Sequence, residues 1–443
     1  MLLVITLIMV GLLILANFQK RIPLWMVLLL LPIFSALALG YSINEITESL
    51  MGKMIDTMRS AGFLMLFALL YFNMLNESGT FETLVNGLVK RLGRFMNVIV
   101  LMVLTLILGV LCGLMAQITV AYLIIFPMLL PLYKALNFKP VYCFVLVNSA
   151  LAAMMFLPWS PGVINVSVVL GCDPVDLGAA ASRTLICLIP AIVFQCVYMA
   201  VMHKREYGTL GAPNVGEAAA LAEAEVESVE AQVKSKKQLR PKMFVPNLLV
   251  LVAILTSLVV FSMPAWLMFM FGACYMILFN YPTMKEHMPI FHESSKTYIN
   301  LLLFMIGISV YLAVFTDMGM VDTLGNAIAT YFPTFLSRYM HIILLASCVV
   351  CIRYIPNRVF TMLYPVLITM GAQFGFDGMA MIAPFLINLT LATTATPLNP
   401  QNVMGCSLLE IEPNYYFSFA MKIQSVTNLI SIALMLVMGM IPV

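Results

Sequence analysis

Two arginines stand in a stretch of the chain that offers them no partner of opposite charge. Arg353 and Arg358 lie within residues 338–373, which are largely apolar and contain neither Asp nor Glu. A guanidinium in an apolar environment is costly unless it is paired, and its planar fork of donors matches a carboxylate bidentately. A bound carboxylate would supply the missing partner. The alternative is that this segment is shallow and that both side chains reach water.

Two proline pairs with the same spacing mark a second place for chemistry. Pro158-Trp-Ser-Pro161 and Pro397-Leu-Asn-Pro400 both interrupt long apolar runs. A proline removes an amide donor and leaves carbonyl oxygens upstream without a helical partner. Those oxygens can coordinate a cation, and the N-terminus of the following half-helix can face an anion. A simple kink is the alternative for one break alone, whereas two breaks at matching positions favour a binding site.

Hydroxyl and amide side chains gather around both breaks. They suit a hydrated carboxylate or a small cation, and the alternative is hydrogen bonding between the helices of a bundle. Together with the two arginines, the candidates for contact with a ligand are Asn148, Ser160, Asn165, Asn388, Thr393, Thr394, Thr396, Asn399 and Asn402.

The elements that would position these residues are transmembrane helices. Apolar residues make up 62% of the chain, charged residues make up 10%, and the mean hydropathy is +1.02, whereas a soluble domain has about 25% charged residues. We predict an all-α integral membrane protein in a lipid bilayer, and the net charge of +3 indicates no nucleic-acid partner. Ten apolar runs are long enough to cross a bilayer, at 1–18, 22–41, 60–76, 140–171, 183–202, 243–262, 264–281, 297–316, 376–411 and 417–441.

Two further segments, 95–135 and 338–373, each combine two apolar helices with a polar or proline break in the middle. We predict that each is a re-entrant hairpin that returns to the side it left, with its tip at 113–119 or 353–358. Irregular backbone at membrane depth must line a cavity or be buried in protein, because lipid cannot satisfy its amides. The two tips and the two breaks are therefore the places where a site can form.

The chain also repeats itself at an offset of 240 positions. Five crossings in each half would make the second copy inverted relative to the first, as in secondary transporters whose halves build one site. The predicted organisation is a first repeat at 1–202, a cytoplasmic linker at 203–242 and a second repeat at 243–443. The matched residues are Glu77, Gly79, Glu82, Thr83, Leu84 and Asn86 with Asp317, Gly319, Asp322, Thr323, Leu324 and Asn326.

Basic residues set the predicted orientation. With the N-terminus outward and both hairpins re-entrant, seventeen of the 23 Lys and Arg residues fall on the cytoplasmic side and four fall outside. Arg353 and Arg358 then lie within the second hairpin. Both termini would face outward, and the linker would lie in the cytoplasm beneath a bacterial inner membrane.

Other chemistry lacks its motifs. The chain contains no P-loop, nucleophile elbow or HExxH, and its Cys and His residues lack the spacing of a disulfide framework or a metal site. We therefore expect no enzymatic activity, no cofactor and no bound metal, and an ATP-driven pump is disfavoured. Glu77 and Asp317 could couple protons, but they stand beside glycines at span ends, where capping is the simpler role.

Three motifs along the first half resemble the citrate–metal/proton symporter family (CitMHS-like citrate transporters), within the wider ion-transporter superfamily. They are Met128-Leu-Leu-Pro-Leu-Tyr-Lys134, Leu157-Pro-Trp-Ser-Pro161 and Leu170-Gly-Cys-Asp-Pro174, and the stretch 356–367 of the second half resembles that family too. The similarity in length and order covers most of the chain outside the linker. It implies a hairpin-plus-broken-helix fold and proton- or sodium-coupled import of an organic anion by alternating access.

The resemblance also assigns site residues. It implies that Gln117, Thr119, Asn357 and Thr361 line the site together with Ser160, Thr396 and Asn399. In that family the first hairpin tip is typically acidic and glycine-rich, whereas here it reads Cys-Gly-Leu-Met-Ala-Gln-Ile-Thr over 112–119. This departure argues against citrate complexed with a metal as the substrate.

The resulting hypothesis is a homodimeric secondary active transporter that couples a proton or a sodium ion to symport of citrate or another di- or tricarboxylate. The coupling cation would bind near the tips and breaks, at Gly113, Gln117, Trp159, Asn357 and Thr396. One alternative is a sodium/proton antiporter of the same architecture, which needs a titratable carboxylate at mid-membrane. The second alternative is a non-transport membrane subunit or an enzyme.

Overall fold

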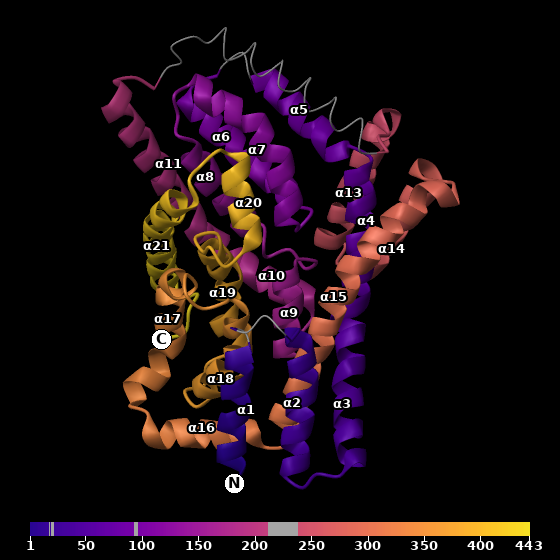
Figure 1. Cartoon of the computed structure of the whole chain (residues 1–443), viewed down its shortest axis with the longest axis vertical. Helices are drawn as coiled ribbons and strands as arrows, with labels where there is room; N and C mark the ends of the chain where they lie inside the picture. The colour runs from indigo at the N-terminus through magenta and orange to yellow at the C-terminus, as the bar shows by residue number, and fades with distance from the viewer. Residues whose placement is uncertain (17, 19–21, 93–95, 211–237) are drawn as a thin grey trace.

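The computed structural model describes residues 1–443 except 17, 19–21, 93–95 and 211–237, and every regular element among the described residues is helical (Figure 1). The predicted all-α membrane class is confirmed. Most of the predicted linker, and residue 95 at the start of the first predicted hairpin, lie outside the described residues.

The helices of the first half are α1 (Leu2–Ala16), α2 (Leu24–Ala38), α3 (Ile43–Thr57), the π-helical turn η1 (Met58–Gly62), α4 (Phe63–Glu77), α5 (Thr80–Leu92), α6 (Val98–Gly113), α7 (Ile118–Ala135), α8 (Pro140–Ala153), α9 (Pro161–Leu170), α10 (Pro174–Arg183) and α11 (Leu185–Tyr207). Those of the second half are η3 (Pro241–Met243), α13 (Phe244–Val259), α14 (Ala265–Tyr275) with η4 (Met276–Asn280), α15 (Met284–Asp317), α16 (Met320–Tyr331), α17 (Thr334–Cys351), α18 (Arg358–Ala372), α19 (Gly378–Thr393), α20 (Pro400–Leu408) and α21 (Pro413–Val437).

Two long helical rods run side by side through the molecule. The first is α3, η1 and α4 without interruption, and the second is α15, so that each is about 50 Å long at 1.5 Å per residue. Thr57 and Ser309 share a buried hydrogen bond of 2.6 Å between them. The sequence predicted only their apolar parts as spans. Both rods begin earlier because capping boxes at Ser42 and Thr283 start each helix ahead of its apolar run.

Two pairs of short helices pack on these rods. α2 of the pair α1–α2 contacts α15, and α14 of the pair α13–α14 contacts α4. The first pair lies at the lower end of the molecule and the second pair at the upper end (Figure 1). A helix of 15 residues, such as α1 or α2, spans about 22 Å, which is less than the roughly 30 Å of a hydrocarbon core.

The short pairs change the expected number of crossings. Among the described residues, seven helices are long and apolar enough to cross a membrane, or eight if the bent pair α9–α10 is one span. The prediction of ten crossings counted the short helices as full spans, because an apolar run does not show where its helix begins and ends. The opposite placement of the two pairs agrees with an inverted repeat, which stays a prediction.

The two predicted hairpins are present as helix pairs. α6 and α7 form hairpin 1, with its tip at 114–117, and α17 and α18 form hairpin 2, with its tip at 352–357. Each first arm packs within its own half, α6 on α8 and α17 on α19. Each second arm packs on a half-helix of the other half, α7 on α20 and α18 on α9. The halves are therefore interlocked at the two breaks.

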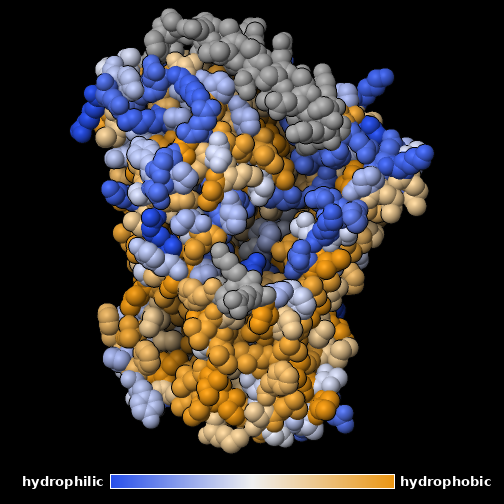
Figure 2. Space-filling view, in the orientation of Figure 1, coloured by the Kyte–Doolittle hydropathy of each residue, from blue (hydrophilic) through white to orange (hydrophobic). Residues whose placement is uncertain are grey.

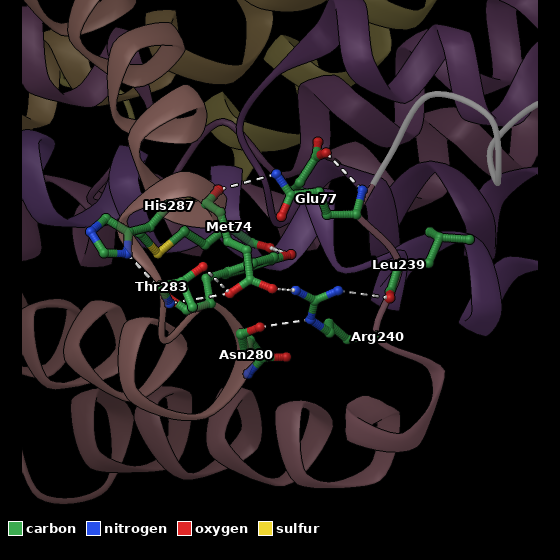
Figure 3. A network of polar contacts seen from close by, with 10 residues as sticks. Met74, Glu77, Leu239, Arg240, Asn280, Thr283 and His287 are labelled. Carbon is green, nitrogen blue, oxygen red and sulfur yellow. Dashed lines mark hydrogen bonds and ion pairs between the residues drawn. The ribbon is translucent and has the colours of Figure 1, made fainter.

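A cluster around Arg240 fixes the chain where it enters the second half (Figure 3). The Arg240 guanidinium donates to the Asn280 carbonyl at 2.6 Å and to the Glu286 carboxylate at 2.5 Å. Two residues before Arg240, the Gln238 backbone amide donates to the Glu77 carboxylate at 2.9 Å. These contacts join the end of α4 to the start of α15, so that Glu77 has a structural partner at its helix end.

The outer surface carries the apolar side chains expected of a protein in lipid. Figure 2 shows apolar side chains dominating the lower part of one face and hydrophilic ones gathering toward its upper end, with a hollow between them. Large apolar side chains are exposed on helices from both halves, among them Leu7, Val103, Ile189 and Leu249. Exposed apolar surface on this scale is what a bilayer covers.

Gly405 on α20 supplies a first prediction, because it lets α20 approach α7 and α8. A Cβ atom at this position would overlap the ring of Phe144, and it would lie 3.0 Å from Phe126. We expect Gly405→Ala to lower the free energy of unfolding by roughly 1–3 kcal/mol through overpacking. The thermal unfolding midpoint of the purified protein in detergent measures this.

Gly87→Ala in α5 is the control, because nothing lies within 4 Å of its would-be Cβ. It should leave the midpoint unchanged or raise it, since Ala favours a helix over Gly. Equal midpoints for the two variants would contradict the proposed close approach of α20.

Candidate functional site

The tip of hairpin 1 lies directly against the first break. The Trp159 indole nitrogen donates to the Leu114 carbonyl at 2.8 Å. A Cβ atom on Gly113 would stand only 2.7 Å from Met154, so the tip backbone can approach the break because this residue is glycine. Two of the cation candidates, Gly113 and Trp159, are therefore brought together.

Gln117 is the last residue of the same tip, and its side chain forms a hydrogen bond to α4 and none to α7. Its Nε2 atom donates to Asn73 Oδ1 on α4 at 2.7 Å, and Asn73 Nδ2 donates to Ser294 on α15 at 2.8 Å. Ala116, just before it, has a φ of 52°, a left-handed conformation that costs energy for a residue with a Cβ. The surrounding contacts must hold this tip in place.

A small and a large cavity meet at Trp159. The small cavity, of about 60 Å³, lies between hairpin 1, α4 and α15, and its wall includes Gln117, Trp159 and Thr297. The large cavity, of about 1500 Å³, reaches the first break from the side of α3 and α10. Trp159 lines both, packed on Phe72 and Phe269. Its indole therefore separates the two spaces.

Charged side chains line the large cavity, and the sequence did not mark them as site residues. One wall carries Lys53 and Asp56 on α3 and Arg59 on η1. The second group is Asp173, just before α10, and Asp176 in its first turn. The three-residue spacing of the first group is a signal that could have found them, since it places them on one helical face.

The second break is held by donors from several helices. Asn402 Nδ2 donates to the carbonyl oxygens of Thr393 at 2.8 Å and Thr396 at 2.9 Å. The Tyr416 hydroxyl donates to the Thr394 carbonyl at 3.0 Å, and Asn399 Nδ2 also reaches the Thr393 carbonyl, at 3.3 Å. The carbonyls freed at this break thus have amide or hydroxyl partners. The Thr393 carbonyl accepts two hydrogen bonds, whereas those of Thr394 and Thr396 each accept one and keep a second lone pair for a ligand.

Asn148 belongs to the network that holds this break. It is fully buried, accepts from the Tyr122 hydroxyl and donates to the Tyr416 hydroxyl at 2.8 Å. Asn388, at the matched position, is also buried and donates to Asn428 at 2.8 Å. The structure therefore places both amides among helix contacts, as the alternative of interhelical hydrogen bonding describes.

The three remaining candidates of the first half, Ser160, Asn165 and Thr119, have different surroundings. Ser160 caps α9 by accepting from the Val163 amide at 3.3 Å. Asn165 has a buried Oδ1 without a hydrogen-bond partner in the described part of the chain. Thr119 is exposed and donates to Gln401 on α20 at 3.3 Å.

Hairpin 2 carries its charges without acidic partners among the described residues. Arg353 Nη1 is buried and has no hydrogen-bond partner, and neither Arg353 nor Arg358 forms a described ion pair. Arg358 begins α18, and its guanidinium carbon lies 5.1 Å from the ring centroid of Phe304 on α15. Asn357 is exposed beside it, and Thr361 is half-buried one turn on. A buried guanidinium donor without an acceptor can bind an anion.

Sequence reasoning missed the residues that hold the candidates in place. Asn73 bonds to the tip of hairpin 1 and Tyr416 to the second break, while Ser294 and Tyr122 support them through Asn73 and Asn148. None of the four stands beside a proline or a glycine. A lone amide in an apolar span was the one available signal, and it applied to Asn73. Within the described residues, no group of three or more His, Cys, Asp or Glu is arranged to hold a metal ion.

Tyr416 supplies a second prediction. Tyr416→Phe leaves the Asn148 amide donor and the Thr394 carbonyl without their shared partner, and an unsatisfied buried polar group costs roughly 1–3 kcal/mol. We expect a lower thermal unfolding midpoint for this variant. Tyr415→Phe, at a neighbouring ring that is 51% exposed, should leave the midpoint unchanged. A Tyr416→Phe midpoint equal to that of the unchanged protein would show that this network does not stabilise the break.

Comparison with known proteins places the chain in a family. A model of the citrate transporter family matches residues 3–288. The uncharacterized transporter YraO of Bacillus subtilis (strain 168) is 21% identical over 391 residues, which cover 88% of this chain and 88% of YraO. The Mg(2+)/citrate complex secondary transporter of the same organism is 23% identical over 431 residues, covering 96% of this chain and 95% of that protein.

A solved structure shares the fold. The crystal structure of the Alcanivorax borkumensis YdaH transporter, described as having an unusual topology, superimposes with a TM-score of 0.52 at 15% identity, over 88% of each chain. The family match and these full-length similarities identify the chain as a multi-pass membrane transporter that belongs to the citrate transporter family.

Proposed function

We propose that this transporter carries a small organic anion, citrate or another di- or tricarboxylate, in symport with a proton or a sodium ion. The observation that carries the proposal is the buried, unpartnered guanidinium nitrogen of Arg353, with the Arg358 guanidinium also lacking a described ion pair. An isolated cationic group in a low-dielectric setting favours an anionic ligand strongly, because the ligand removes the cost of the unpaired charge.

The chemistry of the remaining site fits a carboxylate with several oxygens. Amide and hydroxyl donors are close to the breaks, and helix N-termini follow both of them, at Pro161 and Pro400. A di- or tricarboxylate can use one carboxylate at an arginine and another at such a donor. The named relatives include a citrate transporter and a Mg(2+)/citrate complex transporter, so both free and magnesium-bound citrate belong among the substrates tested.

Transport itself would proceed by alternating access. The two rods and the short pairs would form a scaffold, and the hairpins with the broken helices would form the moving core. The coupling cation would bind near the tips and breaks before the anion does. We further propose that the protein is a homodimer in a bacterial inner membrane, with outward termini and a cytoplasmic linker.

Antiport of sodium and protons is the second candidate function. Asp56, Asp173 and Asp176 line the large cavity, where their carboxylates face a space that a cation can enter, which the sequence alone did not indicate. Glu77 and Asp317 are weaker candidates, because each accepts a hydrogen bond at a helix end, from the Gln238 amide and from the Ser49 hydroxyl.

The thermal unfolding midpoint separates these functions. A panel of organic anions, each with and without sodium and magnesium at two pH values, is added to the purified protein. A ligand that binds the folded state raises the midpoint, so a carboxylate effect that grows with sodium or with acid supports symport and names the coupling ion. A response to sodium and pH alone, with no anion effect, would support the antiporter instead.

The arginines supply the third prediction. In proteoliposomes, Arg353→Ala and Arg358→Ala together should reduce uptake of the identified anion by roughly 100-fold or more, since hydrogen bonds to charged groups contribute about 1.5–3 kcal/mol each. Lysine at both positions should restore only part of the uptake, because it lacks the planar fork.

Arg205→Ala, at an exposed position near the end of α11, is the matched control and should transport normally. Unchanged uptake in the double alanine variant would contradict the role of hairpin 2 in anion binding.

A further inference from the structure

Asn73 is a polar side chain near the C-terminal end of the first rod, and the two polar atoms of its amide make different bonds. Its Oδ1 accepts from Gln117 Nε2 at the hairpin 1 tip, at 2.7 Å, while its Nδ2 donates to Ser294 on α15, at 2.8 Å. Ser294 is 5% exposed. The three side chains thus form a bridge from the tip to both rods.

This bridge decides which end of the Gln117 amide is available to a ligand. Gln117 begins α7, and its side chain makes no capping bond to that helix. Because one N–H of its NH₂ group is held by Asn73, that group is directed toward α4, and the oxygen Oε1 is the acceptor that remains for the small cavity that Gln117 lines. A carbonyl oxygen attracts cations and repels carboxylates, whereas a free NH₂ group would do the reverse.

The opposite polarity is found at hairpin 2, where Arg353 Nη1 is buried without an acceptor. Both hairpins are linked to the same helix, hairpin 1 indirectly through Asn73, which donates to Ser294, and hairpin 2 through Arg358, whose guanidinium lies over the Phe304 ring. Ten residues separate these contacts on α15, about 15 Å at 1.5 Å per residue. A carboxylate and a small cation can be accommodated at two such positions along one wall.

We infer that Asn73 and Ser294 are positioning residues that orient the Gln117 amide so that hairpin 1 presents an acceptor oxygen to a monovalent cation. The inference rests on the proposed cation-coupled transport and adds a division of labour, in which hairpin 1 takes the cation and hairpin 2 takes the anion. Neither positioning residue touches the cation; each acts through Gln117.

The fourth prediction tests this bridge with sodium as the probe and no anion present. The thermal unfolding midpoint of the full-length protein is followed as sodium chloride replaces choline chloride at constant ionic strength. Asn73→Val removes both bonds and should raise the sodium concentration for the half-maximal shift about tenfold, the equivalent of one hydrogen bond. Ser294→Ala, which removes one support of Asn73, should raise it by a smaller factor.

Two further variants separate positioning from a loss of folding. Asn73→Asp keeps an acceptor for the Gln117 NH₂ group and should bind sodium at least as tightly as the unchanged protein. Ser295→Ala removes a hydroxyl that bonds only within its own helix, to the His292 carbonyl, and should behave as the unchanged protein does. A folded Asn73→Val variant with unaltered sodium dependence would overturn the inference.

Failure of the inference is distinguishable from failure of the proposed function. If the unchanged protein shows no sodium effect but responds to an anion and to acid, transport is proton-coupled and the assignment of hairpin 1 to a sodium-like cation is wrong. If anions have no effect while the Asn73 variants shift the sodium response as expected, the positioning role holds and anion symport fails.

Discussion

The structure depends on one constraint, that backbone polar groups outside helical geometry need partners when no water or lipid can supply them. The chain leaves helical geometry at two breaks and two tips. At the second break, Asn402 and Tyr416 satisfy three carbonyl oxygens between them. At the first break, Trp159 satisfies a carbonyl of the neighbouring tip instead. The partners come from other helices, so that satisfying the backbone also joins those helices together.

Much of this arrangement could be predicted from the sequence, and the reason is local. Proline pairs and a polar interruption mark the breaks and tips because they act on the backbone where they stand. The starts of the rods were missed, although the capping boxes at Ser42 and Thr283 are local signals too. An apolar run was taken as the whole helix, and the same simplification gave α1, α2 and α14 the length of full crossings.

The side chains around the site could be predicted only in part, because their partners are distant in the sequence. Asn148 was expected to line the site from its position before a break, but its partner Tyr416 lies 268 residues away. Asn73 was not singled out, since nothing local relates it to Gln117 or Ser294. The unpaired charges on hairpin 2 were the opposite case: the lack of an acid within one short segment is itself a local fact, and Arg353 indeed has a buried nitrogen without a partner in the described chain.

The interlocking of the halves has a consequence for biosynthesis. α7 packs on α20, and α18 packs on α9. A ribosome that has completed only the first half has therefore made a hairpin 1 that can pack on α8, but the part of its surface that α20 covers has no partner yet. Domains usually fold as units from the N-terminus onward. Here the tip of hairpin 1 finds bonds to Trp159 and Asn73 within the first half, but the contact of α7 with α20 forms only after the second half is inserted. A chain built in this way uses its C-terminal quarter to cover residues that were synthesised first, so truncation late in translation leaves one face of α7 uncovered.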